Sequence, residues 1–318
     1  MDPLSLRVTG AYLLDWAIGD PRWLPHPVRG LGWLILKGEH WLRARIRREE
    51  WAGILLVIGI VLGTWFGVSA LLHLSRAVSP WAGWGTEILL LFCCLSTRDL
   101  AVETWPVHRA LQAGRLGEAR RHVAMIVGRD TDSLNEPEIV RATLETVAES
   151  TMDGIVAPLF YAVIGGAPLA CLYKAVNTLD SMVGYRSARY LKFGRAAAQV
   201  DRWMNWVPAR CTALLLAGSA PLMGLAGGRA LQAVGRDAVP TGENSFLPEA
   251  AMAGALGVRL GGINFYQGKP VQAPPLGDPI RPLQSDLIPT ALRLMMVSSA
   301  LALLLFILLR LGGTWWIR

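Results

Sequence analysis

Long apolar stretches separated by polar segments dominate the chain. Four of them contain no Asp, Glu, Lys or Arg: residues 51–75, 154–173, 211–228 and 294–309. A transmembrane helix needs about 20 mainly apolar residues, so these stretches predict membrane segments. A fifth stretch, 77–97, carries one charged residue, Glu87, which we expect either near the membrane interface or buried within the protein.

Two of these stretches are interrupted near their middle. Gly165, Gly166 and Pro168 interrupt one, and Gly218 and Pro221 interrupt the next. Broken helices at membrane depth are tolerated only where they are buried in protein or line a cavity. We therefore expect one or both to be re-entrant or to lie against the protein core, which would let the basic loops around them share one membrane face.

The pattern predicts a mainly α, polytopic helical membrane protein with about four to five membrane segments, some of them re-entrant, and polar cytoplasmic helices and loops. No internal repeat divides the chain, so we treat 1–318 as one domain. Its predicted parts are a cytoplasmic entry (1–50), a membrane hairpin (51–97), a polar core with the apolar segment 154–173 (98–205), a membrane segment (206–228), a loop region (229–290) and a C-terminal membrane helix (291–312).

The polar segments carry their own signals. Mixed polar and apolar residues at helical spacing predict helices over 106–122 and 137–153, the second begun by Pro137 after Asn135. Residues 262–289 are rich in Pro and Gly, which predicts an extended loop. Strand signals are weak throughout.

Composition supports the membrane assignment. The chain is 53% hydrophobic and only 17% charged, against about 25% charged in soluble domains, which excludes a disordered protein, a coiled coil and an ordinary soluble enzyme. The net charge is +7. Four arginines between positions 43 and 48 precede the first span, and the positive-inside rule places that region in the cytoplasm. The excess positive charge is better explained by this topology than by nucleic-acid binding.

Four polar groups are candidates for chemistry. The first is a proline-rich loop presenting Asp20, His26 and Arg29; its rigid backbone is typical of a ligand site, although a membrane-interface turn with solvated charges fits equally well. The second is Gly128–Asp132, in which Arg129, Asp130 and Asp132 suit a phosphate or Mg²⁺, with a simple polar turn as the alternative.

The third group lies along a predicted helix. Arg141, Glu145, Glu149 and Asp153 recur every four residues and therefore share one helical face. Three carboxylates at this spacing repel one another unless a cation neutralises them. Arg141 offsets part of that repulsion, and a bound Mg²⁺ would offset the rest. A solvated helix face is the alternative, but the apolar segment after Asp153 disfavours it.

The fourth group follows an apolar run directly. Lys174 and Asn177 fall on one helical face, with Asp180 nearby. Lysine binds phosphate as a point charge, although this one also fits the role of an interface anchor. A weaker fifth group, Glu243, Asn244 and Glu249, precedes a stretch of small residues. The chain has no P-loop, no HExxH and no serine-nucleophile motif.

These motifs resemble one known family. Val127–Thr131, Glu145–Phe160, Gly165–Leu169 and above all Lys174–Tyr185 look like the CobD/CbiB family, the adenosylcobinamide-phosphate synthases of cobalamin biosynthesis. The N-terminal Asp15–Arg29 region and the 249–262 segment match as well, so the resemblance covers nearly the whole chain. The chain departs from the family pattern at Ser150, 199–202 and 242–244, which leaves the roles of the last two segments open.

The resemblance implies an amide ligation. Adenosylcobyric acid would be joined to 1-amino-2-propanol or its O-phosphate, with ATP and Mg²⁺ activating the carboxylate; the corrinoid would be a substrate and not a prosthetic group. The implied catalytic residues are Glu145, Glu149, Asp153 and His26. The implied substrate and phosphate ligands are Arg129, Lys174, Asn177, Asp180, Asp20 and Arg29. The implied Mg²⁺ ligands are Asp130, Asp132, Glu145 and Glu149.

The resemblance also sets the expected location and partners. It implies a multi-pass protein of the bacterial inner membrane with a cytoplasmic active site, in contact with the lipid bilayer and with other membrane-associated cobalamin-assembly enzymes, and with no nucleic-acid partner. A membrane transporter and a sensor resembling the AmpE-type proteins remain alternatives. The absence of two repeated halves counts against the transporter, and the dense carboxylate–lysine set counts against the sensor.

Overall fold

The structure is a computed structural model that describes residues 2–20, 27–185 and 187–316. It contains two compact units, one drawn from Met1–Ser96, Ala157–Trp206 and Leu305–Arg318, the other from Thr97–Val156 and Val207–Leu304. Both are mainly helical, which confirms the predicted fold class. The single-domain assignment and its internal boundaries stay a prediction.

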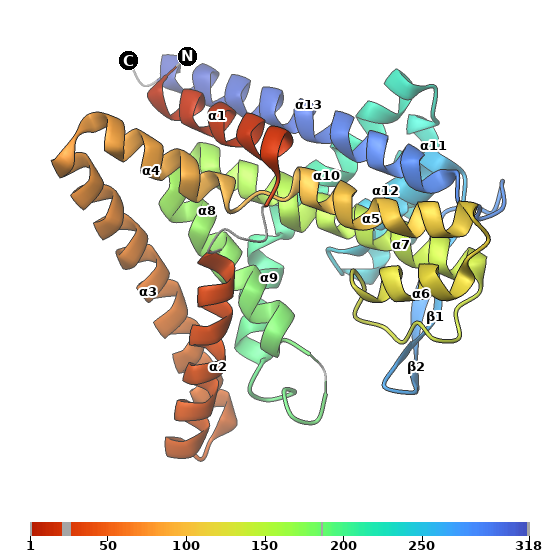
Figure 1. Cartoon of the computed structure of the whole chain (residues 1–318), viewed down its shortest axis with the longest axis horizontal. Coiled ribbons are helices and arrows are strands. Elements are labelled where there is room, and N and C mark those ends of the chain that lie inside the picture. The colour runs from red at the N-terminus through yellow and green to blue at the C-terminus, as the bar shows by residue number, and fades with distance from the viewer. Residues whose placement is uncertain (1, 21–26, 186, 317–318) are drawn as a thin grey trace. The chain divides into compact units, whose positions relative to one another are not determined.

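The first unit is a helical assembly (Figure 1). Its elements are α1 (Pro3–Ile18), α2 (Pro27–Arg45), α3 (Glu49–Val78), α4 (Pro80–Phe92), α8 (Ala157–Val183), α9 (Arg195–Met204) and the C-terminal part of α13 (Leu287–Trp316). α3 packs against α2, α4 and α8. Ile35, Leu179 and Phe193 are at most 1% exposed in the core that these helices share, and burial of each such side chain contributes about 1.5–3 kcal/mol.

Three helical segments in the described part of the chain are long and apolar enough to cross a membrane. They are Glu49–Val78, Glu136–Val183 and Leu287–Gly312. These spans contain the predicted apolar stretches 51–75, 154–173 and 294–309. The structure therefore agrees with a polytopic helical membrane protein.

Two predicted membrane segments are shorter than expected. The stretch 77–97 contains α4, of 13 residues, and the first half of 211–228 lies in α10 (Trp206–Ser219), of 14 residues. At 1.5 Å per residue, neither helix crosses a hydrocarbon core of about 30 Å. Ser79 caps a new helix and α4 ends at Phe92, so α4 is a short apolar helix, and the membrane hairpin over 51–97 stays a prediction.

Glu87 is buried within the first unit. Its carboxylate lies 3.1 Å from Arg7 Nε and 2.9 Å from Arg76 Nη2, and its side chain is 4% exposed. Arg7 also stacks over the Trp84 ring at 5.2 Å. A buried carboxylate with two guanidinium partners is compensated, so the second of the two expectations for Glu87 is confirmed.

The predicted break in the third apolar stretch is present. Gly165 and Gly166 have non-helical backbone angles inside α8, and Gly166 has φ +65°. A Cβ at Gly166 would lie 2.7 Å from Glu87 Oε1. The kink therefore depends on glycine for its backbone conformation and for its close approach to the Glu87 ion pairs.

We predict that Gly166→Ala destabilises the protein by about 1–3 kcal/mol, the usual strain of a positive φ in a residue with a side chain, with a further cost from the contact with Glu87. Thermal unfolding of the detergent-solubilised protein measures this. Gly85→Ala is the matched control, because a Cβ there meets no atom within 4 Å and alanine favours the helix. Equal unfolding temperatures for Gly166→Ala and the wild type would contradict the prediction.

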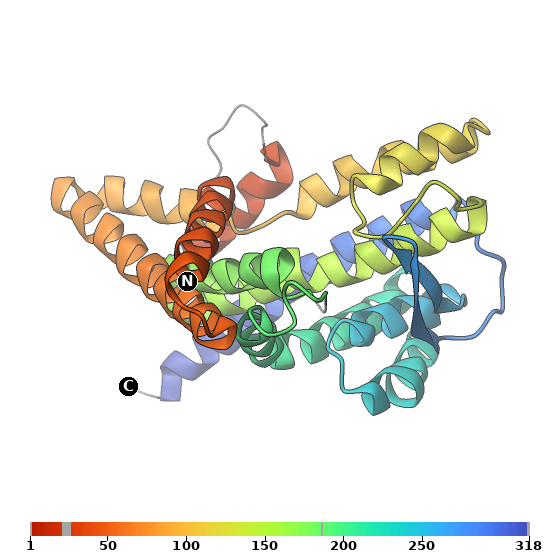
Figure 2. The same cartoon turned by 90° about the horizontal axis from the view of Figure 1, so that it is seen from below.

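The second unit combines helices with one small sheet (Figure 2). Its elements are α5 (Thr97–Gln112), α6 (Leu116–Ala124), α7 (Glu136–Thr151), η1 (Met152–Val156), most of α10, η2 (Ala220–Met223), α11 (Gly227–Ala233), η3 (Val234–Ala238), η4 (Val239–Thr241), α12 (Phe246–Leu256), β1 (Leu260–Tyr266), β2 (Lys269–Leu276) and the first part of α13. The predicted helix over 106–122 is two helices, because Gly114, at φ +67°, separates α5 from α6.

The prediction of an extended loop over 262–289 is wrong in its first half. β1 and β2 form an antiparallel hairpin, and both central turn residues, Gln267 and Gly268, have positive φ, as a two-residue hairpin turn requires. A bulge lies between Leu260 and Gly262. The hairpin contacts α7 and α12, and it thereby reaches the predicted carboxylate face.

Candidate functional site

Helix α7 forms for local reasons and positions the predicted carboxylates. The Asn135 side chain accepts from the Glu138 backbone N–H, and the Glu138 side chain accepts from the Asn135 N–H, with Pro137 in the first turn. This capping box satisfies two of the donors that a helix N-terminus exposes. The helix then places Arg141, Glu145 and Glu149 one turn apart, and the sequence prediction of this helix is confirmed.

Glu145 is the centre of a buried ion-pair network within the second unit. Arg129 forms an ion pair with Glu145 Oε2, and Arg141 Nη1 lies 3.5 Å from Glu145 Oε1. The Gly261 backbone N–H donates to the same Oε1 at 2.8 Å. The side chains of Arg129, Arg141 and Glu145 are at most 10% exposed. The network therefore joins the 128–132 segment, α7 and the hairpin.

The two arginines also hold the hairpin directly. Arg129 Nη1 donates to Asn264 Oδ1 at 2.7 Å. Arg141 donates to the carbonyl oxygens of Gly261 and Ile263. Guanidinium groups suit this task because their five donors form a rigid fork. Glu145 is thus surrounded by donors, which favours a positioning role for it over the predicted catalytic and metal-ligand roles.

We predict that Glu145→Gln lowers the free energy of unfolding by about 3–5 kcal/mol, the cost of removing one partner of a buried ion pair. Denaturation in detergent, followed by tryptophan fluorescence, measures this. Glu136→Gln, an exposed position on the same helix, should change the stability by less than about 1 kcal/mol. Similar stabilities for the two variants would show that the network contributes little.

Asp130 supports the hairpin turn. Its carboxylate accepts from the backbone N–H groups of Gln267 and Gly268 at 3.1 and 2.7 Å, and its own N–H donates to Phe265 O at 2.8 Å. This arrangement fits a structural clamp better than the predicted metal ligand. Asp132, three residues before the capping residue Asn135, is exposed.

Glu249 joins the same group from α12. It is 8% exposed, and burial, with the negative charges of Glu145 and Glu149, raises its pKa well above the ordinary value despite Arg129 and Arg141. The pKa of Tyr266 on the hairpin is raised as well, first by burial. Glu249 is only a weak candidate from sequence patterns, since its nearness to α7 depends on tertiary packing. A carboxyl group with a raised pKa keeps its proton to higher pH than an ordinary one, and in that form it can donate a hydrogen bond or pass a proton.

We predict that Glu249 makes the free energy of unfolding fall as pH rises above about 4.5. The folded pKa exceeds the unfolded value near 4.5, so the folded state holds the proton longer as pH rises, and stability falls from about pH 4.5 upward until the folded pKa is passed. Glu249→Gln should remove this loss and be more stable than the wild type at pH 7. Parallel pH-stability curves for the two proteins would contradict this.

The described residues give limited support to the implied Mg²⁺ site. No three His, Cys, Asp or Glu side chains among them are close enough to form a metal cluster. Asp130 and Glu145 are engaged as described, whereas Glu149 and Asp132 are exposed. Mg²⁺ that arrives with a nucleotide needs only one or two carboxylates beside the phosphates. Glu149 fits that reduced role, and the full set of four predicted ligands does not.

The remaining predicted residues lie in other parts of the chain. Asp153 is half-buried in η1, still in the second unit, and Asp20 (half-buried) and Arg29 (exposed) belong to the first. Asn177 and Asp180 are half-buried on α8, also in the first unit. His26 lies outside the described residues. The second unit thus brings Arg129, Asp130, Glu145 and Glu149 together, with Glu249 added.

Lys174 lies on the wall of a largely apolar cavity in the first unit. It lines a cavity of about 470 Å³ between α2, α3, α4 and α8, and it is the only charged side chain among the described residues that do so. The rest of the wall is mainly apolar, with Cys94 and Cys171 beside the lysine. An ionisable side chain within a membrane segment is a functional candidate by default, so the structure supports the choice of Lys174.

A larger cavity in the second unit contains none of the predicted residues. It has a volume of about 900 Å³ and lies between α5, α6 and α13, where Trp105, Arg109 and Arg293 line it. Its size is within the range of small-molecule sites. The carboxylate network is therefore not a wall of this cavity.

The fold and this site define a class: a polytopic helical membrane protein with a buried arginine–carboxylate network. The comparisons name the family. The CobD/Cbib protein family matches residues 8–295, and the chain belongs to this family. It is 49% identical to the cobalamin biosynthesis protein CobD of Geobacter metallireducens, over 94% of each chain. No solved structure matches it significantly.

Further relatives agree. The chain is 47% identical to the cobalamin biosynthesis protein CobD of Klebsiella pneumoniae, over 96% of each chain. It is 44% identical to the cobalamin biosynthesis protein CbiB of Salmonella typhi, over 95% of this chain and 96% of the relative. The resemblance inferred from the motifs is confirmed.

Proposed function

We propose that this protein acts in cobalamin biosynthesis as an ATP-dependent carbon–nitrogen ligase. It would join adenosylcobyric acid to 1-amino-2-propanol or its O-phosphate. The observation that carries the proposal is the family match over residues 8–295, with full-length relatives named as cobalamin biosynthesis proteins. The arginine–carboxylate network and Lys174 supply chemistry that suits such a reaction.

The reaction needs an activated carboxylate, because a carboxylate oxygen is a poor leaving group. Attack of that oxygen on ATP gives an acyl phosphate with release of ADP, or an acyl adenylate with release of pyrophosphate. The amine nitrogen then attacks the acyl carbon, the amide bond forms and phosphate or AMP leaves. The nitrogen loses a proton to a general base.

The chain offers residues for these steps. Glu149 is exposed on α7 beside the buried Glu249, so it suits the base that accepts the amine proton. Arg129 and Arg141 hold the site in shape through Glu145. The Lys174 ammonium faces an apolar cavity, where an anionic group gains more from the charge than it would in water.

The proposal includes a location. The basic residues before α3 support a cytoplasmic location for that end of the helix under the positive-inside rule. We therefore propose a bacterial inner-membrane protein with a cytoplasmic active site, working beside other membrane-associated cobalamin-assembly enzymes.

A nucleotide assay tests the activation step. Purified protein with ATP and Mg²⁺ should release ADP and phosphate, or AMP and pyrophosphate, only when both adenosylcobyric acid and an amine are present. The identity of the released nucleotide distinguishes the two routes. Release that is independent of the acid, or no release in the presence of both substrates, would count against the proposal.

A further inference from the structure

A cavity beside α9, separate from the Lys174 cavity and the carboxylate network, is lined by more cationic than anionic side chains. It has a volume of about 490 Å³, within the range of small-molecule sites. Three cationic side chains and one carboxylate line it, together with two tyrosines: Lys192, Arg195, Arg202, Glu50, Tyr185 and Tyr190. The charged groups on its wall therefore sum to two positive charges.

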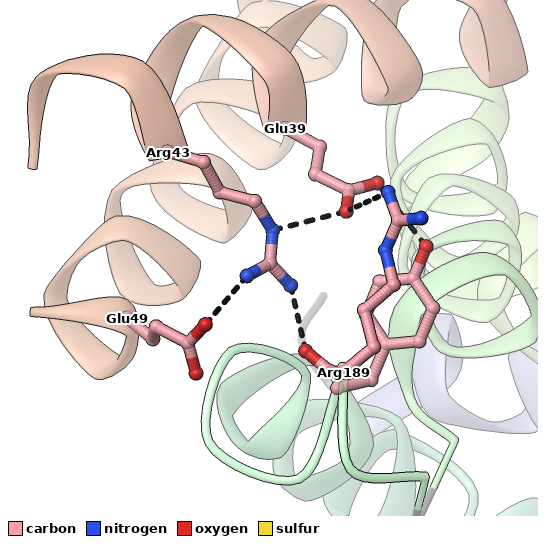
Figure 3. Close-up of polar contacts among 5 residues, drawn as sticks. Glu39, Arg43, Glu49 and Arg189 are labelled. Carbon is pink, nitrogen blue, oxygen red and sulfur yellow. Dashed lines mark hydrogen bonds and ion pairs between the residues drawn. The ribbon is translucent and has the colours of Figure 1, made fainter. Parts of the chain in front are cut away.

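The loop that carries Lys192 is held by ion pairs around the buried Glu39 carboxylate (Figure 3). Glu39, 2% exposed, accepts from Arg43 Nε and from Arg189 Nη2, each at 3.0 Å. The Tyr190 hydroxyl donates to the same carboxylate at 3.3 Å. The network thus ties the 189–190 backbone to α2.

Arg43 connects three elements within this network. Its Nη1 donates to Glu49 Oε1 at 2.8 Å and its Nη2 to the Arg189 carbonyl oxygen at 2.8 Å. Its guanidinium also stacks over the Phe193 ring at 4.1 Å, and Phe193 is 1% exposed. Lys192 and Arg195 flank this anchored aromatic. The side chains of Lys192 and Arg195 are exposed, but the backbone that carries them is held in place, which lowers the ordering cost of binding an anion.

We propose that this cavity binds a phosphate group. Arginine forks and lysine ammonium groups are the usual protein partners of phosphate oxygens, and the exposed Tyr185 hydroxyl adds a donor. The cavity borders the first turn of α3, directly after the basic 43–48 segment, on the side where soluble phosphate esters and anionic lipid head groups both occur. If the occupant is ATP, this cavity is the nucleotide site of the proposed ligase. Binding is measured without the corrinoid or the amine, so the test does not depend on ligase turnover.

Equilibrium binding on the purified full-length chain tests it. The soluble arm uses radiolabelled ATP with inorganic phosphate as competitor. The lipid arm measures the binding of fluorescent phosphatidylglycerol to the protein. Fluorescent phosphatidylcholine, which has no net charge, is the comparison lipid. K192Q/R195Q should weaken binding at least about tenfold in one arm, since it removes charge-assisted hydrogen bonds. The arm that responds identifies the source of the phosphate.

R47Q/R48Q is the matched control. It also removes two positive charges, but from exposed positions that do not line the cavity. Binding should therefore change less than twofold. The single R195Q variant should show a smaller loss in the same arm, and thermal unfolding confirms that each variant is folded. No response to K192Q/R195Q in either arm, or an equal loss in the control, would overturn the proposal.

Discussion

Glu149→Gln should lower the rate of amide formation by about 10²–10⁴-fold, the usual contribution of a general acid or base, while the protein keeps its fold. Glu149 is exposed on α7, one turn from the buried network around Glu145. Glutamine has almost the same shape and no basic carboxylate. Because the side chain is exposed, we expect a change in stability of no more than about 0.5 kcal/mol.

The measurement is single-turnover product formation together with thermal unfolding. Glu136→Gln serves as the control, because it removes an exposed carboxylate from the first turn of the same helix. A slow Glu149→Gln enzyme with a normal unfolding temperature separates a catalytic role from a structural one. Full activity in Glu149→Gln would remove this residue from the proposed site.

Lys174→Ala should abolish turnover without loss of stability. The ammonium lies in a largely apolar cavity, where a charge is costly to the folded state, so removing it should leave the unfolding temperature unchanged or raised. If the lysine holds an anionic substrate group, that benefit to stability is accompanied by a loss of function, as in other active sites.

Lys37→Ala is the control for charge. Lys37 is exposed on α2 and does not itself line the Lys174 cavity. Its ammonium lies 5.4 Å from the ring centre of Trp33, which is one wall residue of that cavity. The rate and KM of each variant should be measured together, because a pure binding role raises KM first. An active Lys174→Ala enzyme with a lowered unfolding temperature would show that the lysine is a structural anchor.

The sequence predicted those features that depend on local physics. The Asn135–Glu138 capping box and the spacing of Glu145 and Glu149 define α7 from adjacent residues alone. The kink at Gly165 and Gly166 follows from the glycine pair itself. The family could also be identified, because the Lys174–Tyr185 motif is specific and lies in one continuous segment.

The β1–β2 hairpin depends on contacts between residues that are distant in sequence, and the sequence analysis did not predict it. Pro270, Pro274 and Pro275 disfavour a strand, yet β2 pairs with β1, where Arg141 and Asp130 support the hairpin. The Gln267-Gly268 turn was the one local signal of that hairpin, and it is weaker than Asn-Gly.

The roles of individual carboxylates likewise depend on the folded structure. Periodicity places Glu145 and Glu149 on one face but does not distinguish them. The structure does, because Arg129 and Gly261 contact Glu145 from segments that are distant in sequence, and Glu149 stays exposed. Glu249 reaches the same group from α12 for a similar reason.

The central claim is that this membrane protein forms an amide bond on a corrinoid. The most direct test incubates purified, detergent-solubilised protein with adenosylcobyric acid, ATP, Mg²⁺ and either 1-amino-2-propanol or its O-phosphate, and measures the corrinoid mass. The account predicts a mass gain equal to one amine minus one water, dependent on ATP, with one amine preferred. An unchanged corrinoid mass with both amines, from protein shown to be folded, would contradict it.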